Sequence, residues 1–334
     1  TGRAVRYHLR VPLLAGAGRA ELDALWRIVR KGKLDEVAFF VPHAEERSPG
    51  LGTLEECRRS VEFLGPVFER LRAQGVEPSI NVWWTMSFSH FPSLPRSLRD
   101  RFSFRWAVSM TGRQSMSAAC PLDRAWRDHV REIYGMFASL RPARLWIDDD
   151  VHAVLRADLH SPCFCRACLG EMRRRTGRRF TRRGLLKAVL ADPPNQVREH
   201  WLEFQEELIR DLLSELAEAV HAASPSTSVS NMFSGIPYHW AEGRRWKEHV
   251  AALGTPAPYG RPPIGSYSEA TALGIAQGLA EARLARAALP EGMPLAPEIE
   301  NYPHTRFSKS VALAAAQMTM GQLFGMNEVT LSVY

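Results

Sequence analysis

The sequence lacks the features that would place it among membrane, secreted or fibrous proteins. Its 334 residues contain no run of roughly 18 consecutive apolar residues, so we expect no membrane-spanning segment. The N-terminus has no apolar signal-peptide core and begins at Thr1, so we expect a trimmed, cytoplasmic chain. Hydrophobic residues make up 45% and charged residues 24% of the chain, which excludes disorder, collagen and coiled coil.

The chain has fewer acidic than basic residues. It contains 36 Asp and Glu and 43 Lys and Arg, which gives a net charge of +7. Nearly all the cations are Arg, and the pattern scatters them over many expected helices rather than one stripe. We therefore expect no nucleic-acid partner. A steep salt dependence of DNA retention would show the opposite.

Cysteine is scarce, with five residues and therefore an odd count. Three of them crowd into six residues, Cys163, Cys165 and Cys168. This C-x-C-x2-C spacing indicates a metal site rather than disulfides. A tetrahedral zinc site needs a fourth ligand, for which the candidates are Cys120, or His160 or His152 in a Cys3His variant. Cys57 lies in a helix pattern and reads as an ordinary small buried residue.

Strand-like and helix-like segments alternate along the whole chain without a linker. The strand-like segments are 5–14, 36–42, 78–86, 144–150, 227–233, 263–267, 293–300 and 328–334. The helix-like segments are 20–30, 53–74, 124–140, a long stretch to 223 broken near Pro193–Pro194, 244–253, 269–288 and 310–324. Eight strands joined by helices predict one α/β domain over 1–334, a (β/α)8 TIM barrel. A doubly wound open sheet is disfavoured, since no glycine-rich loop follows the first strand.

The last helix of such a barrel is missing from the pattern, because the eighth strand runs to Tyr334. Two alternatives remain open. Either the protein continues beyond Tyr334, or its end is trimmed or disordered.

Three acids, Asp148, Asp149 and Asp150, end the fourth predicted strand. Barrel enzymes carry their chemistry at this end of the strands. Because side chains alternate along a strand, Leu145 and Ile147 should face the helices, Asp148 and Asp150 the barrel mouth, and Asp149 the other side. A helix cap or a surface turn is the alternative.

A second acidic group, Glu298 and Glu300, ends the seventh predicted strand, where a solvated loop is the alternative. Strands four and seven lie across a barrel mouth from each other. Two carboxyl groups placed there can flank one bond, as glycoside hydrolysis requires. The sequence therefore predicts a carbohydrate substrate.

Polar and aromatic residues near the other strand ends are candidates for binding sugar hydroxyls and ring faces. They are Arg10, His43, Trp83, Trp84, Asn231, Tyr267 and His304, with Asp148 beside them. For each residue alone, core packing or ordinary surface is the alternative interpretation.

These motifs together resemble glycoside hydrolase family 42, the β-galactosidase barrels of clan A, or a relative of it. The matching residues are Cys120-Pro121, Cys163, Cys165, Cys168 and Glu300-Asn301-Tyr302-Pro303. The resemblance implies a structural zinc on Cys120 and the other three thiolates, and no metal in catalysis. Relatives of this kind often associate, which leaves a homo-oligomer open.

The resemblance also assigns catalytic roles to the acids. Asp149-Asp150 stand where the family has Asn-Glu, so Asp150 becomes the acid/base, one methylene shorter than Glu. Glu300 becomes the preferred nucleophile and Glu298 the second candidate. The expected reaction is hydrolysis of a β-linked sugar with retention of configuration.

Two other functions fit the same residues. One is a carbohydrate-binding barrel without catalysis. The other is a metal-dependent hydrolase with the metal on Asp148, Asp150, His152 and Glu298, although no His-x-His follows the first strand.

Overall fold

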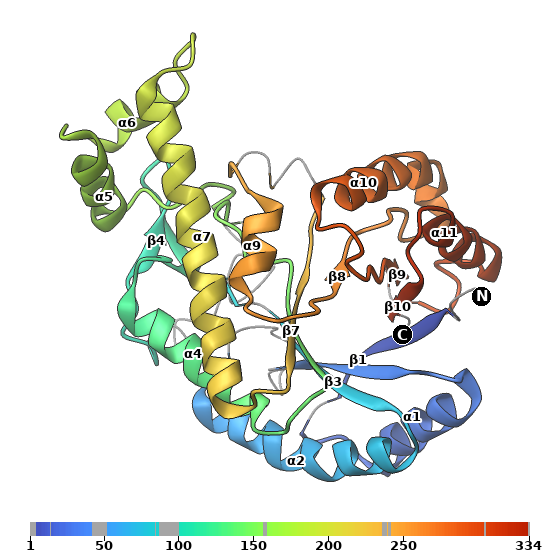
Figure 1. Ribbon diagram of the computed structural model, residues 1–334. Helices are drawn as coiled ribbons and strands as arrows, with labels where there is room; N and C mark the ends of the chain where they lie inside the picture. The colour runs from blue at the N-terminus through green and yellow to red at the C-terminus, as the bar shows by residue number, and fades with distance from the viewer. Residues whose placement is uncertain are drawn as a thin grey trace.

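The computed structural model describes residues 5–13, 15–41, 52–83, 85–86, 100–155, 159–235, 239, 242–303 and 305–332. Eight parallel strands form one sheet in the order β8-β7-β6-β3-β2-β1-β10-β9 (Figure 1). Parallel bridges from Gly260 to Leu295 and from Pro263 to Glu298 join β8 to β9, the two edges of that sheet. The molecule is therefore a TIM barrel, as the alternating pattern predicts.

The barrel strands are β1 (Arg6–Pro12), β2 (Glu36–Val41), β3 (Glu77–Val82), β6 (Arg144–Ile147), β7 (Ser228–Met232), β8 (Gly260–Arg261), β9 (Glu298–Glu300) and β10 (Glu328–Ser332). The helices are α1 (Arg19–Gly32), α2 (Leu54–Ala73), α4 (Arg124–Ala138), α5 (Arg166–Thr176), α6 (Arg182–Val189), α7 (Gln196–Ala223), α9 (Trp246–Ala252), α10 (Ile275–Ala288) and α11 (Val311–Leu323), with a 3-10 turn η1 (Glu269–Gly274) before α10. None of these helices is long and apolar enough to cross a membrane.

Local sequence signals set the helix starts. Thr53 caps α2 in a reciprocal capping box with Glu56. The side chain of Asp123 caps α4, and that of Asn195 caps the 28-residue α7. Each cap satisfies a backbone N–H that the helix itself leaves unpaired.

The inside of the barrel is unusually polar and is arranged in layers. Near the start of the strands, His8 contacts Glu328 at 2.5 Å, and Arg144 contacts Glu36. A small apolar layer that includes Trp146 follows. Arg10 and the ends of β6 and β9 lie above it, so the charges at the strand ends sit over a packed floor.

Two parts of the fold differ from the sequence prediction. The sixth barrel strand lies at Gly260–Arg261 rather than 263–267, because Pro262 and Pro263 have no N–H to continue a ladder. A hairpin outside the barrel, β4 (Trp106–Val108) paired antiparallel with β5 (Gln114–Ala119), was not expected.

Candidate active site

Asp148 lies inside the barrel mouth, where the alternation of β6 continues one residue past the strand. Leu145 and Ile147 pack in the outer core, as predicted. Arg10 Nη2 donates to Asp148 Oδ2 at 2.9 Å, and Asn81 Nδ2 donates to the same oxygen at 3.0 Å. Burial raises the pKa of Asp148 to about 7, although Arg10 opposes the shift.

Strand alternation predicts that Asp149 points away from the barrel mouth. This prediction is wrong, because the side chain of Asp149 lines the cavity at the mouth. Ser234 Oγ donates to Asp149 Oδ2 at 2.5 Å, and Arg261 Nη2 lies 3.3 Å from Oδ1. The physical reason is that β6 ends at Ile147, so Asp149 stands in a turn where strand alternation no longer applies.

Asp150 is buried beneath the segment that follows β3 and does not line that cavity. The backbone N–H of Met86 donates to Asp150 Oδ2 at 2.7 Å, and Oδ1 has no hydrogen-bond partner among the described residues. Burial, followed by the charge of Asp148, raises the pKa of Asp150 well above its usual range. The buried position differs from the mouth position that alternation predicts, again because the strand has ended.

Glu298, at the start of β9, is the carboxylate with the most cationic surroundings. Its Oε1 accepts from Arg10 Nη1 at 2.8 Å and also contacts Arg261 Nη1. Tyr267 Oη lies 3.5 Å from Oε2, and the charge of Glu298 together with burial raises the pKa of that phenol. Glu298 therefore forms ion pairs with two guanidinium groups.

Glu300 lies two residues further along β9 and is half-buried. Burial and the neighbouring charge of Glu298 raise its pKa to about 7, against the opposing effect of Arg10 and Arg261. Burial lowers the pKa of the Lys309 ammonium group to about 8, and the nearby charge of Glu300 opposes this shift. β9 thus carries one carboxyl group that contacts two guanidinium groups and one whose pKa is raised by burial.

A cavity of about 350 Å³ opens at this end of the barrel. Its lining comes from the ends of β6, β7, β8 and β9 and from α10, and includes Asp149, Ser234, Tyr267, Gln277, Glu281 and Glu298. The cavity is large enough for a small ligand and presents hydroxyl, amide and carboxyl groups.

The structure brings together some predicted binding residues and leaves others apart. Arg10 and Tyr267 reach the carboxyl groups. Trp83 is half-buried with its ring 5.4 Å from that of Phe40, and Asn231 is buried, its Nδ2 donating to the carbonyl of Met232. His43, Trp84 and His304 lie outside the described residues.

Sequence reasoning missed three residues of the site, Arg261, Asn81 and Ser234. Arg261 stood before the sixth strand as that strand was predicted, whereas it is the last residue of β8. Asn81 offers a signal that was available, since it is a polar residue between the apolar residues Ile80 and Val82 of the strand.

The acids and His152 do not meet as a metal-ligand set. His152 Nδ1 lies 3.6 Å from Glu242 instead. Among the described residues, the one group with metal-ligand geometry is formed by cysteines. The geometry therefore gives no support to a catalytic metal on Asp148, Asp150, His152 and Glu298.

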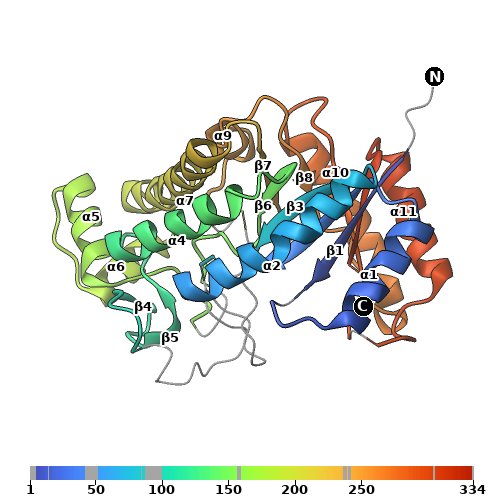
Figure 2. The same cartoon turned by 90° about the horizontal axis from the view of Figure 1, so that it is seen from below.

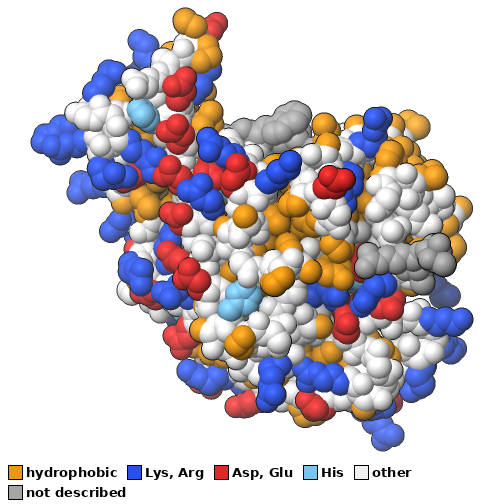
Figure 3. Space-filling view, viewed as in Figure 1, with side chains coloured by type: hydrophobic (Ala, Val, Ile, Leu, Met, Phe, Trp, Pro, Cys, Tyr) orange, Lys and Arg blue, Asp and Glu red, His pale blue; other side chains and the backbone are white. Residues whose placement is uncertain are grey.

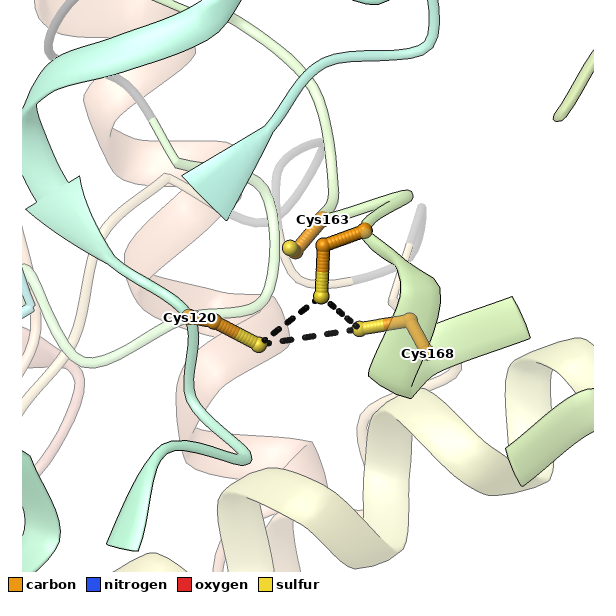
Figure 4. A group of neighbouring side chains, drawn as sticks. Cys120, Cys163 and Cys168 are labelled. Carbon is orange, nitrogen blue, oxygen red and sulfur yellow. Dashed lines mark hydrogen bonds between the residues drawn. The ribbon is translucent and has the colours of Figure 1, made fainter. Parts of the chain in front are cut away.

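Cys120, Cys163, Cys165 and Cys168 are buried, and their sulfur atoms all lie within 4.8 Å of one another. Figure 4 shows the side chains of Cys120, Cys163 and Cys168 around one small space. Cys120 Sγ lies 3.5 Å from that of Cys165 and 3.8 Å from that of Cys168. Zn–S bonds of about 2.3 Å in a tetrahedron place sulfurs about 3.8 Å apart, so the cluster fits a closed four-thiolate metal site.

Comparisons with known proteins agree with the fold. A β-galactosidase from Bacillus circulans sp. alkalophilus superposes with a TM-score of 0.67 at 12% identity, over 99% of this chain and 50% of that one. A catalytic mutant of a GH42 β-galactosidase from G. stearothermophilus gives 0.66 at 10% identity, over 98% and 51%. The catalytic domain of a β-amylase from Paenibacillus polymyxa gives 0.60 at 11% identity, over 99% and 93%.

These likenesses define the class of fold, a TIM barrel of the kind that glycoside hydrolases use. The chain spans about half the length of the β-galactosidases it resembles. No family model matches the sequence, and no curated protein matches it.

Proposed function

We propose that this barrel is a glycoside hydrolase that cleaves a β-linked sugar, with two carboxyl groups acting from opposite sides of the mouth. The observation that carries the proposal is the meeting of Asp149 from β6 and Glu298 from β9 at one cavity, joined through Arg261. The shared fold of glycosidase barrels supports it.

The proton donor in this proposal is Asp149. Burial raises the pKa of Asp148 to about 7 and that of Asp150 well above its usual range, so the acids on either side of Asp149 lie in surroundings that disfavour charge. Asp149 is the member of the three that lines the cavity. It takes the acid/base role that the family resemblance gives to Asp150.

The nucleophile in this proposal is Glu298 rather than Glu300. Glu298 lines the cavity and is contacted by two guanidinium groups, those of Arg10 and Arg261. Glu300 is protonated up to about pH 7. Glycosidases likewise place their carboxyl groups in different surroundings, which gives each group its own role.

The chemistry then runs in two steps. Asp149 gives its proton to the glycosidic oxygen as Glu298 attacks the anomeric carbon, which breaks the C–O bond and forms a glycosyl ester. Asp149, now a carboxylate, takes a proton from water, whose oxygen attacks the same carbon and releases Glu298. The sugar leaves with its configuration retained.

Hydrolysis of aryl β-glycosides by Asp149→Asn, Glu298→Gln, Asp150→Asn and Glu300→Gln tests these roles. We expect Glu298→Gln to lose activity on all substrates. Asp149→Asn should lose about 100-fold or more with a poor leaving group and little with dinitrophenolate, which needs no proton. Exposed carboxyls provide controls, Asp128→Asn on α4 and Glu69→Gln on α2.

Two results would contradict the proposal. Full activity of Glu298→Gln would show that Glu298 is not the nucleophile. Sugar binding by the wild-type protein without turnover across a broad panel of glycosides would define a carbohydrate-binding barrel instead.

We also propose that the four cysteines hold a structural zinc ion. All four positions of the tetrahedron are filled by Cys120, Cys163, Cys165 and Cys168, which leaves no position open for a substrate. The ion would fasten the segment after β6 to the start of α4. The chemistry at Asp149 and Glu298 does not involve it.

A further inference from the structure

The net positive charge of this protein lies in one short part of the chain. Residues 166–187, here called the basic arm, contain nine Lys or Arg and one Asp or Glu, which is Glu171. The other residues contain 34 of the 43 basic and 35 of the 36 acidic side chains. The cations are spread along the chain, as the sequence pattern indicates, but the rest of the chain is nearly neutral, so the net charge is concentrated in the arm.

The basic arm projects from the barrel. It consists of α5, α6 and the turn between them, and Figures 1 and 2 show both helices beyond the barrel, with β4 nearby. Figure 3 shows Lys and Arg side chains gathered on this projection. The arm belongs to the connection that follows β6, so it leaves the barrel at the end where Asp149 lies.

Most of the cationic side chains of the arm form no ion pair with the described residues. Glu171 pairs with Arg174 and Arg175, and Arg175 also contacts Glu207. The exposed residues Arg173, Arg178, Arg179 and Arg183 form no ion pair among the described residues. Mutual repulsion of these side chains disfavours the fold unless an anion meets them.

The start of α6 adds to this unfavourable charge. Arg182 and Arg183 occupy its first turn, which contains no acidic residue. The N-terminal end of a helix already has a partial positive charge, so cations there are destabilising and anions stabilising. An anionic ligand bound at this surface would offset the unfavourable charge.

A cavity of about 380 Å³ lies between the arm and the beginning of α7. Arg175 and Arg178 line it on one side, and Asn195, Gln196 and His200 on the other. Its cationic and amide groups suit a carboxylate together with the hydroxyls of a sugar ring, since a guanidinium can bind a carboxylate through two parallel hydrogen bonds.

We propose that the basic arm binds an acidic polysaccharide whose sugars carry carboxylates, and holds it beside the barrel mouth. The choice of a glycan rests on the proposed function, whereas the anionic character of the ligand rests on the arm alone. Single-stranded nucleic acid fits less well. Phe180, the aromatic residue of the arm, is half-buried beside Arg178, which leaves no open platform for bases there.

Binding of the full chain to sodium polygalacturonate tests this proposal, with a neutral galactan and duplex DNA measured alongside. The arm variant combines Arg178→Ala, Arg179→Ala and Arg183→Ala. The matched control combines Arg19→Ala, Arg58→Ala and Arg124→Ala, which removes the same charge from side chains that are 95%, 56% and 71% exposed.

We expect the wild-type chain to bind polygalacturonate more weakly as salt rises, and not to bind the galactan. The arm variant should bind about tenfold more weakly. The control should bind within about twofold of wild type, and an Arg→Lys version of the arm variant, which keeps the charge but loses the paired hydrogen bonds, should bind with intermediate affinity. An unchanged melting temperature and metal content will show that the arm variant is folded.

Three outcomes would overturn the proposal: no binding of polygalacturonate, equal losses in the arm variant and the control, or arm-dependent binding of DNA that is tighter than that of the glycan. Hydrolysis of a small aryl β-glycoside separates the two proposals, because it does not reach the arm. Without hydrolysis but with arm-dependent glycan binding, the proposed function fails and the arm proposal stands.

Discussion

Arg261 Nη2 lies 3.3 Å from Oδ1 of Asp149, which ties the end of the sixth barrel strand to the end of the fourth. The second terminal nitrogen of the same guanidinium contacts Glu298, from the seventh strand. Arg261 is only 2% exposed. One buried cation therefore contacts two carboxyl groups that barrel closure brings together.

Replacement of Arg261 by Met should leave both carboxylates with less compensation. We expect the free energy of unfolding to fall by about 3–5 kcal/mol, because a buried charge without its partner is costly. Urea denaturation at pH 7 measures this change. The matched substitution Arg124→Met, on an exposed helix position, should change it by less than about 0.5 kcal/mol. Equal effects of the two substitutions would show that the network is not a stabilising one.

Glu300 makes stability depend on pH in a predictable direction. Its pKa of about 7 in the folded chain exceeds the ordinary value of 4.5, so the folded state favours the protonated form. Stability from this group is fully present below about pH 4.5 and is lost as the pH rises towards 7 and beyond.

Glu300→Gln removes that titration and should behave like the protonated wild type. The variant and the wild type should be equally stable near pH 4.5. At pH 8 the variant should be more stable by up to about 3 kcal/mol, since one pKa unit corresponds to about 1.4 kcal/mol. Urea denaturation at both pH values measures the difference, with Glu69→Gln as an exposed control. A difference that does not change with pH would contradict the raised pKa.

Much of this fold could be predicted from the sequence, because apolar runs and caps are local signals. The strand-like run at 36–42 and the helix-like segment at 53–74 are examples, which the structure shows as β2 at Glu36–Val41 and α2 at Leu54–Ala73. β8 is an exception, since its two residues have too little pattern to be recognised. Its place is set by pairing with β7 and β9, which are distant in the sequence.

The residues of the site were harder to predict than the strands that carry them. Alternation correctly turns Leu145 outward, but it cannot be extended beyond Ile147, where β6 ends. The direction of Asp149 depends on Ser234 and Arg261, which come from two other strand ends. Such contacts arise from barrel closure, so no spacing in the sequence reports them.

The metal proposal predicts one zinc ion per chain by elemental analysis. Cys120→Ser should lose that zinc and lower the melting temperature, because three thiolates no longer close the tetrahedron. Cys57→Ala, a buried cysteine of α2 outside the cluster, should retain the full zinc content. Zinc-free wild-type protein that melts at the same temperature as the purified form would contradict the structural role.

The cavity at the barrel mouth depends on a close contact between α10 and the segment after β8. A Cβ on Gly278 would lie 2.0 Å from the carbonyl oxygen of Ile264 and 2.8 Å from the Cα of Gly265. Both neighbours are backbone atoms, which cannot move aside as a flexible side chain can. Only glycine lets the helix approach this closely.

Gly278→Ala should therefore destabilise the protein by about 2–3 kcal/mol, because α10 must move away from β8. The same change at Gly170, a helical position of α5 with no atom within 4 Å of a new Cβ, should stabilise it by up to about 1 kcal/mol. Urea denaturation of both variants measures whether each substitution lowers or raises the free energy of unfolding. Because α10 and residues 263–267 line the cavity, the loss at Gly278 should be accompanied by weaker binding of sugars there. Equal stabilisation at both positions would show that the helix and the strand end are not in contact.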